Sequence, residues 1–315
     1  TTEIYTLSLH DALPILFRLG RLREAFAAYE DRFDRRDCPP RKFPRPLWDG
    51  ADPAGKTILL HHEQGLGDTL MFCRYAPLVA ARGARVVLGV QPEVAPLLAG
   101  LPGVDRVAVP GSRLGFDLHA PLLSLPRIFA TDLDSIPAQA PYIRLPGGTA
   151  FRLRRPAGCR LAVGLVWAGN PRHTADAARS LPLRELLPLA AVPGVRLHSL
   201  QFGERAADIA RLGCAGLITD LSPQVGPLAE TAAALRDLDL LITVDTAALH
   251  LAGALGRPAW GLLSSTPDWR WLPGRPDSPW YPSLRLFHQP KPGDWATVVA
   301  QVREELGRMA SAAGA

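Results

Sequence analysis

Apolar residues along the chain recur in short runs that alternate with longer segments of helical spacing. The strand-like runs are 56–62, 85–90, 104–109 and the beginning of 116–128 in the first half, and 161–167, 195–200, 217–219, 241–244 and 259–262 in the second. Strands that alternate with helices are typical of parallel sheets. We therefore expect an α/β protein whose ligand site lies where the carboxyl ends of the strands meet.

Segments rich in proline, glycine and arginine interrupt this alternation and predict domain boundaries. We expect a linker at 38–55, a Rossmann-like domain at 56–145, a second linker at 146–160, a second Rossmann-like domain at 161–292, and a terminal helix with its tail at 293–315. The terminal helix is predicted over 294–309 from its amphipathic pattern.

The beginning of the chain needs separate treatment. Residues 1–15 resemble a translated sequencing adapter, and we set them aside as one would a cloning scar. Residues 16–37 carry apolar and aromatic side chains at helical spacing and resemble the second half of a tetratricopeptide repeat. A single repeat cannot bury its apolar face alone, so this segment predicts the remnant of a longer array. The alternative is one amphipathic helix that packs on the domain that follows.

The strand 241–244 and the helix after it form the motif around which a ligand site is organised. Asp245 and Thr246 stand where the helix begins, so its first backbone N–H groups point away from the carboxyl edge of the sheet and suit a phosphate. His250, one turn further on, lies on the same helix face. An ordinary strand, turn and helix with a good cap is the alternative.

Three loops converge on this point by the topology of a parallel sheet: 169–180, 201–204 and 245–250. Backbone amides and arginine side chains can neutralise the negative charge of a diphosphate. The donor-binding residues that we predict are Asn170, Arg172, His173, Arg179, Gln201, Glu204, Asp245, Thr246, Ala247 and His250.

Composition narrows the class of protein. Its 315 residues are enough for about two domains, and 47% hydrophobic with 21% charged residues is ordinary for a globular protein. A formal charge of +5, without a basic stripe, favours small anionic ligands over nucleic acid. The four cysteines lack metal-ligand spacing, and neither a transmembrane-length apolar run nor a signal peptide is apparent. We expect buried free thiols and a cytoplasmic protein.

Two motifs resemble a known family. VDTAALHLAGALGRPAWGLL, at 244–263, resembles the donor-site segment of glycosyltransferases of the lipopolysaccharide heptosyltransferase type (glycosyltransferase family 9-like), in particular relatives carried behind tetratricopeptide repeats in bacteria. EQGLGDT, at 63–69, resembles the short Gly-Asp loop of their acceptor site. The resemblance extends over roughly 48–309. It implies a GT-B-like fold, in which two Rossmann-like domains face each other across a cleft and the terminal helix crosses back to the first domain.

The resemblance also implies roles for individual residues. Asp68 matches the catalytic base, although an Asp that caps a helix at a glycine turn is a structural alternative. Glu204 lies near the acid that binds ribose in the family. In this chain ADAAR, at 175–179, stands where basic residues are common, so a phosphate contact is missing. The acceptor-side residues implied are Gln64, Gly65, Gly67, Thr69 and His119, of which His119 also suits a structural role.

The function implied is an inverting transfer of a sugar from a nucleotide diphosphate sugar to a glycan, lipid or protein acceptor. No cofactor is expected, and no metal, because the Asp-x-Asp motif of metal-dependent glycosyltransferases is missing from the sequence. Aromatic side chains in the loop 264–283 can stack on a sugar or base, or pack over the sheet. Two further hypotheses stay open: a non-catalytic nucleotide-sugar-binding scaffold whose repeats bind protein, and a nucleotide-sugar epimerase-like enzyme.

Overall fold

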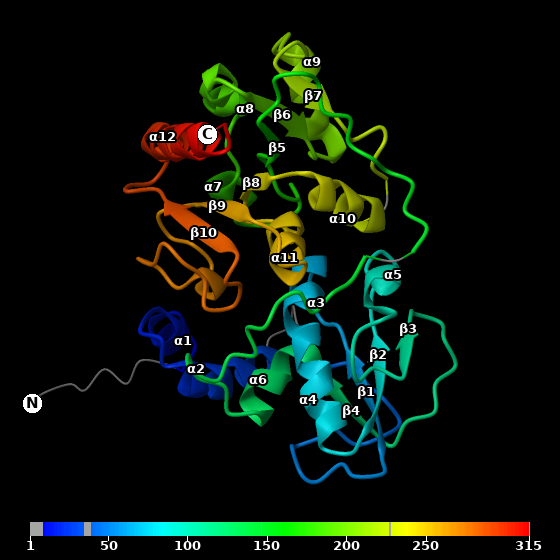
Figure 1. Cartoon of the computed structure of the whole chain (residues 1–315). Helices are drawn as coiled ribbons and strands as arrows, with labels where there is room; N and C mark the ends of the chain where they lie inside the picture. Colours follow the sequence, from blue (N-terminus) through cyan, green and yellow to red (C-terminus); the bar gives the residue numbers. More distant parts are fainter. Residues whose placement is uncertain (1–8, 35–38, 146, 227, 315) are drawn as a thin grey trace, which may run out of the picture.

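Two parallel sheets, each in its own half of the molecule, form the framework (Figure 1). The computed structural model describes residues 9–34, 39–145, 147–226 and 228–314. The first sheet has the strand order β3-β2-β1-β4. Its strands are β1 (Thr57–His61), β2 (Arg85–Gly89), β3 (Arg106–Ala108) and β4 (Leu118–Pro121). Every pairing in it is parallel, as the alternating sequence pattern predicts.

Short helices cover one face of the first sheet. They are α3 (Leu66–Phe72), η2 (Cys73–Tyr75), α4 (Ala76–Ala81), α5 (Ala95–Leu98), η3 (Leu122–Ser124) and α6 (Leu125–Ile128). The sequence of residues 70–83 predicts one continuous helix, but the structure divides this segment into α3, η2 and α4, because Pro77 has no N–H to bond back to Cys73. On the opposite face, connecting segments bring Phe43 and Phe116 over Leu59 and Val87.

The second sheet is larger and has the strand order β10-β9-β8-β5-β6-β7. Its strands are β5 (Leu161–Val166), β6 (Val195–Ser199), β7 (Ile218–Asp220), β8 (Leu240–Val244), β9 (Ala259–Leu263) and β10 (Leu284–His288). All of its pairings are parallel. The sequence pattern missed β10, which follows the long aromatic loop.

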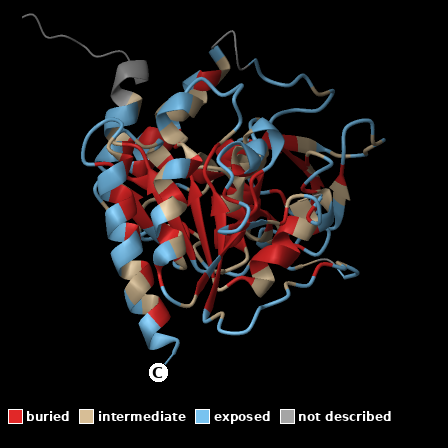
Figure 2. Cartoon of the chain, turned by 90° about the horizontal axis from the view of Figure 1, so that it is seen from above, coloured by how far each residue is buried: buried red, intermediate tan, exposed pale blue. Residues whose placement is uncertain are grey.

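Helices lie on both faces of the second sheet. They are α7 (Asp176–Arg179), α8 (Leu183–Leu186), η4 (Leu187–Ala191), η5 (Gly203–Ala207), α9 (Asp208–Arg211), α10 (Leu228–Asp237), α11 (Ala247–Ala254), η6 (Trp269–Trp271) and α12 (Trp295–Ala312). Figure 2 shows the buried strands between helices whose outer surfaces are exposed. One face of the sheet packs on α8, η4 and α12, and the other packs on α10 and α11.

The terminal helix α12 stays with the second domain, so the crossing back to the first domain that the resemblance implied is wrong. Its buried side chains, among them Val298, Val302 and Leu306, share a core with Leu197 and Phe287 of the second sheet. The apolar stripe is used entirely against that sheet and its neighbouring helices.

The first described residues form two helices and a 3₁₀ turn: α1 (Leu9–Arg18), α2 (Leu22–Ala28) and η1 (Tyr29–Asp34). Gly20 separates the helices with a φ of +70°. Phe17 stacks on Trp269 with ring centroids 4.1 Å apart, and Phe26 contacts the same ring edge-on. The helical segment therefore packs on the aromatic loop of the second domain. Residues 9–15 of the adapter-like stretch belong to α1, and the tetratricopeptide origin stays a prediction.

The two domains meet directly through α3 and α11 (Figure 1). Gly67 allows this approach, because a Cβ atom built on it would lie 2.7 Å from Cδ2 of His250. A single hydrophobic core runs from the N-terminal helices through the first domain to α10, α11 and the aromatic loop. Both halves therefore hold fixed positions beside the site between them.

Candidate functional site

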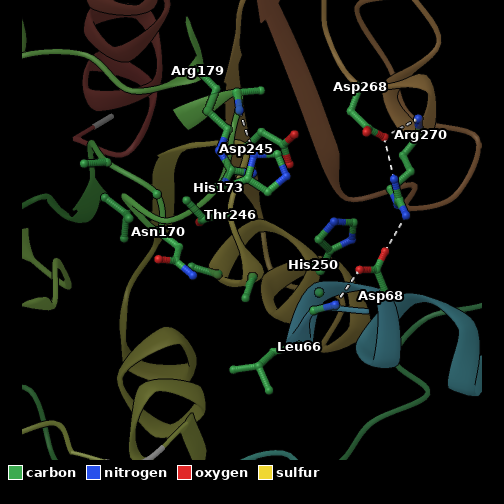
Figure 3. Close-up of a pocket in the computed structure, with 18 of the residues that line it drawn as sticks. Leu66, Asp68, Asn170, His173, Arg179, Asp245, Thr246, His250, Asp268 and Arg270 are labelled. Atoms are coloured by element: carbon green, nitrogen blue, oxygen red, sulfur yellow. Dashed lines mark hydrogen bonds and ion pairs between the residues drawn. The ribbon is translucent and has the colours of Figure 1, made fainter. Parts of the chain in front are cut away.

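A cavity of about 780 Å³ opens between the two halves, at the carboxyl ends of both sheets. Its walls come from the loops that follow β1, β5, β6, β8 and β9. Figure 3 shows Asp68 and Arg270 facing each other on one side, with Asn170, Arg179 and Thr246 on the other. The arrangement agrees with the rule that parallel sheets bind ligands beyond their carboxyl edges.

Most of the predicted site residues line this one cavity. From the first domain these are Gln64, Gly65, Gly67 and Asp68; from the second they are Asn170, His173, Arg179, Gln201, Asp245, Thr246, Ala247 and His250. Residues as far apart in the sequence as Gln64 and His250 are thus brought together, because α3 of the first domain packs on α11 of the second.

Two residues expected on the acceptor side do not line the cavity. Thr69 is 1% exposed, and its hydroxyl donates to Gln91 Oε1 at 2.8 Å. His119 lies within β4, where its Nδ1 is 3.3 Å from His61 Nε2 and its ring packs on Phe43. Both side chains hold the first domain together, and for His119 this is the structural role left open by the sequence.

Two residues expected on the donor side also lie outside the cavity lining. Arg172 is exposed, and its backbone N–H donates to Asn170 Oδ1 at 3.0 Å in a turn that directs the arginine outward. Glu204 lies in η5 and is exposed as well. Arg172 was predicted to bind the diphosphate, and Glu204 was predicted to accept hydrogen bonds from ribose. Neither is among the described residues that line the cavity.

Asp68 combines a structural bond with a half-buried position in the cavity wall. It is the third residue of α3, and its Oδ2 accepts a hydrogen bond from the Gly65 N–H at 2.9 Å. The sequence alternative made Asp68 the N-cap residue; in the structure Gly65 is the N-cap residue, and Asp68 caps its N–H from the third position of the helix. Its Oδ1 accepts from Arg270 Nη2 at 2.5 Å. Asp68 is therefore held rigidly at the helix start, with Arg270 as its partner from the other domain.

The loop between β8 and α11 forms the opposite wall. Thr246 is the N-cap residue and has extended backbone angles, with φ of −143° and ψ of 171°. Its hydroxyl lies 3.1 Å from that of Thr243. The first N–H groups of a helix have no carbonyl partner within it, so those following Thr246 are available to an anion.

Two titratable groups of this wall have displaced pKa values. Burial, together with the charge of Asp268, raises the pKa of Asp245 to about 6. Burial lowers the pKa of His250 to about 3, so this imidazole stays neutral, with Nδ1 at 2.9 Å from the Tyr281 hydroxyl. His250 therefore supports the wall through packing and hydrogen bonding, without adding positive charge.

The Asp245 pKa leads to a testable pH dependence. A carboxyl group whose pKa is raised on folding stabilises the protein fully below its unfolded value of about 4, and this stability is lost as the pH rises through about 6. Asp245→Asn mimics the protonated form. We expect the variant to exceed the wild type by about 2 kcal/mol in free energy of unfolding at pH 7.5, and to equal it near pH 4. Urea unfolding of both proteins at several pH values measures this, and a difference independent of pH would contradict it.

Two charged residues of the cavity were missed by the sequence reasoning. Asp268 and Arg270 lie in the loop after β9, and Arg270 Nη1 donates to Asp268 Oδ1 at 2.7 Å. The signal was available, because this loop also follows the carboxyl end of a strand in the second sheet. The tryptophans of this loop led to a prediction of stacking or packing alone, which left out Asp268 and Arg270 on either side of Trp269.

The aromatic side chains of that loop pack inside the protein. Trp271, Trp280 and Tyr281 are at most 1% exposed, and Trp271 lies against His250 with ring centroids 4.9 Å apart. Trp269 packs on the N-terminal helices. The packing alternative thus describes these rings, which are absent from the cavity lining.

Cysteines and acidic residues form no metal-binding group in the part of the chain that the structure describes. Cys73 and Cys214 are buried free thiols, Cys159 is a half-buried one, and Cys38 lies outside the described residues. Within the same described ranges, no helix has the length and apolar character needed to span a bilayer.

Comparison with known proteins agrees with this geometry. Residues 198–292 match the family model described as glycosyltransferase family 9 (heptosyltransferase). Over 330 aligned positions the chain is 29% identical to Protein FlbA of Caulobacter vibrioides, covering 93% of this chain and 53% of FlbA. The chain thus spans about half the length of that curated relative.

Solved structures share the fold. ADP-heptose LPS heptosyltransferase II of E. coli aligns with a TM-score of 0.53 and 17% identity, covering 82% of this chain and 100% of the other. E. coli heptosyltransferase WaaC with ADP-2-deoxy-2-fluoro heptose aligns with a TM-score of 0.53 and 16% identity, covering 79% and 99%. The dodecameric iron-containing heptosyltransferase TibC with ADP-D-β-D-heptose aligns with a TM-score of 0.55 and 16% identity, covering 86% and 81%.

The family match and the shared architecture together support a glycosyltransferase. The fold is α/β and GT-B-like, with two parallel sheets, as the sequence predicted. The matched segment contains Gln201, Glu204 and the β8–α11 motif on which the donor-site prediction was based.

Proposed function

We propose that the chain transfers a sugar, with inversion, from a nucleotide diphosphate sugar to the hydroxyl group of a glycan, lipid or protein. The observation that carries the proposal is the cavity itself, in which a carboxylate of the first domain faces a helix N-terminus and an arginine of the second. These are the groups that an acceptor hydroxyl and a diphosphate leaving group respectively require.

The donor half binds the leaving group. The free N–H groups at the start of α11 and the Arg179 guanidinium offer hydrogen bonds and positive charge to a diphosphate. Asn170 and Gln201 line the same wall and can bind hydroxyl groups. Because charge on the diphosphate increases as the bond to the sugar breaks, donors fixed in this position stabilise the transition state.

The acceptor half supplies the base. Asp68 takes the proton of the acceptor hydroxyl while the oxygen forms a bond to the anomeric carbon, and the nucleoside diphosphate leaves with the electrons of the broken bond. Attack on the face of the anomeric carbon opposite the bond that breaks inverts the configuration. The direct contact of α3 with α11 fixes the two halves, and therefore the two substrates, relative to each other. Such positioning contributes at most several kcal/mol to lowering the activation barrier.

Calorimetric titration tests the donor assignment. The chain is titrated with ADP, GDP, UDP, CDP and dTDP and with their sugars, and the titrations are repeated with Asp68→Ala and Asp245→Ala. We expect one nucleotide to bind selectively, with binding retained or strengthened in Asp68→Ala and weakened about tenfold in Asp245→Ala, which removes the side chain between β8 and the N-cap residue of α11. Failure of a folded chain to bind any of them would favour the scaffold hypothesis, and product formed from donor alone would favour the epimerase-like one.

A further inference from the structure

The charges that line the cavity are unfavourable for a diphosphate as they stand. The carboxylates are those of Asp68, Asp245 and Asp268, and the arginines are Arg179 and Arg270. A nucleoside diphosphate brings at least two more negative charges, so its binding requires every available cation. Arg172, the second cation predicted from the sequence, is exposed and lies outside this lining.

Arg270 is the remaining cation, and its bonds leave it incompletely satisfied. The residue is 8% exposed; its Nη1 donates to Asp268 at 2.7 Å, and its Nη2 donates to Asp68 at 2.5 Å and to Gln64 Oε1 at 3.4 Å. Its Nε is buried without a hydrogen-bond partner in the described structure. A guanidinium has five N–H donors in a planar fork that matches phosphate oxygens. Arg270 thus has both unused hydrogen-bonding capacity and a position in the cavity wall.

The bonds made by Nη1 and by Nη2 of Arg270 differ, because the partner of Nη1 belongs to the same loop and the partners of Nη2 belong to the other domain. Asp268 also accepts a hydrogen bond from the Arg270 backbone N–H at 3.0 Å, so this contact is local to the loop. The contacts with Asp68 and Gln64 join the loop to the first domain, and Nη2 makes both of them. Nη2 can therefore change its partner while Nη1 stays on Asp268.

We propose that Arg270 is the second phosphate-binding cation of the donor site, and that a bound diphosphate takes its Nη2 from Asp68. The inference rests on the proposed function and adds an order of binding to it. Before the donor binds, Oδ1 of Asp68 is occupied by Arg270; afterwards it is free to accept a hydrogen bond from the acceptor hydroxyl. Donor binding thus prepares Asp68 for catalysis, and an acceptor that arrives first meets an occupied carboxylate.

A double-mutant cycle on nucleoside diphosphate binding tests this without knowledge of the acceptor. The nucleoside diphosphate selected in the titration panel is titrated into the wild type, Asp68→Asn, Arg270→Gln and the double variant. Asp68→Asn frees Arg270, and we expect it to bind the nucleotide about fivefold more tightly. Arg270→Gln should weaken binding about tenfold, and in that background Asp68→Asn should change affinity less than about twofold.

The cycle separates exchange of Arg270 from simple repulsion by Asp68. If Asp68 only repels the phosphates, removing it helps at least as much when Arg270 is absent, and this result would overturn the inference. Asp277→Asn is the matched control, since it removes the same charge from the same loop at an exposed pair with Arg275; its affinity should equal that of the wild type. Absence of nucleotide binding in the wild type and in Asp68→Asn would instead overturn the donor assignment, and the inference with it.

Discussion

Asp68→Asn should lower sugar transfer by about 10³-fold while nucleotide binding is retained or strengthened, because a general base typically contributes between about 10² and 10⁴ to the rate. The amide keeps the size of the side chain and can still accept the Gly65 N–H bond that fixes the start of α3. It cannot take up the proton of an acceptor hydroxyl. The loss should therefore appear in kcat, with the KM for the donor unchanged or lower.

The measurement is the release of nucleoside diphosphate from the nucleotide sugar that binds, with glycan, lipid and protein fractions offered separately as acceptors. Asp277→Asn, which changes the charge of an exposed pair, should keep full activity in the same assay. A variant at Asp68 that still turns over at the wild-type rate would remove this residue from the mechanism. In that case the role of Asp68 would be structural: its carboxylate would serve to cap the start of α3 through the bond from the Gly65 N–H.

The sequence pattern predicts most of this fold because it depends on local periodicity. Every strand of the second sheet from β5 to β9 corresponds to an apolar run flanked by turn residues, and the carboxyl-end rule then brings their loops together. β10 was missed because it follows a long loop whose tryptophans dominated the interpretation. It pairs with β9 at the edge of the sheet, and no motif covers its own residues.

The site residues that were missed or misplaced share one physical cause. A motif predicts which residues stand beside a strand end, and the orientation of each side chain depends on its hydrogen bonds. The backbone N–H of Arg172 donates to Asn170 Oδ1 in a turn, and the arginine side chain is exposed. The Thr69 hydroxyl donates to Gln91 Oε1. The neighbour of Arg270, Trp269, packs against Phe17 of α1 and Phe26 of α2. No local pattern could relate residues that far apart in the sequence.

Arg74 is a second buried arginine whose partners lie far from it in the sequence, in the core between the domains, and its substitution should have a large effect on stability. The residue is 3% exposed and lies just after α3. Its guanidinium donates to the carbonyl oxygens of Met71 at 2.7 Å and Trp280 at 2.5 Å, and to the Tyr142 hydroxyl at 2.8 Å. It also faces the ring of Tyr281 at 4.5 Å. Among the described residues, no carboxylate lies within ion-pair distance of it, so carbonyl dipoles and aromatic faces hold this charge.

Arg74→Ala should lower the free energy of unfolding by about 4 kcal/mol, because the variant leaves buried carbonyl oxygens without a donor and opens a cavity. Arg74→Lys should lose less, since an ammonium group keeps the charge but cannot reach acceptors in several directions at once. Urea unfolding measures both, with the exposed Arg303→Ala as the control that should stay within about 0.5 kcal/mol of the wild type.

The pattern of unfolding gives a second result from the same experiment. Because Arg74 joins α3 to the segment 137–142 and to the aromatic loop of the second domain, its loss should weaken the contact between the halves more than either sheet. We expect the single cooperative transition of the wild type to become two in Arg74→Ala. A stable Arg74→Ala protein that unfolds in one step would mean that α3 and α11 hold the domains together without it, through the close approach at Gly67.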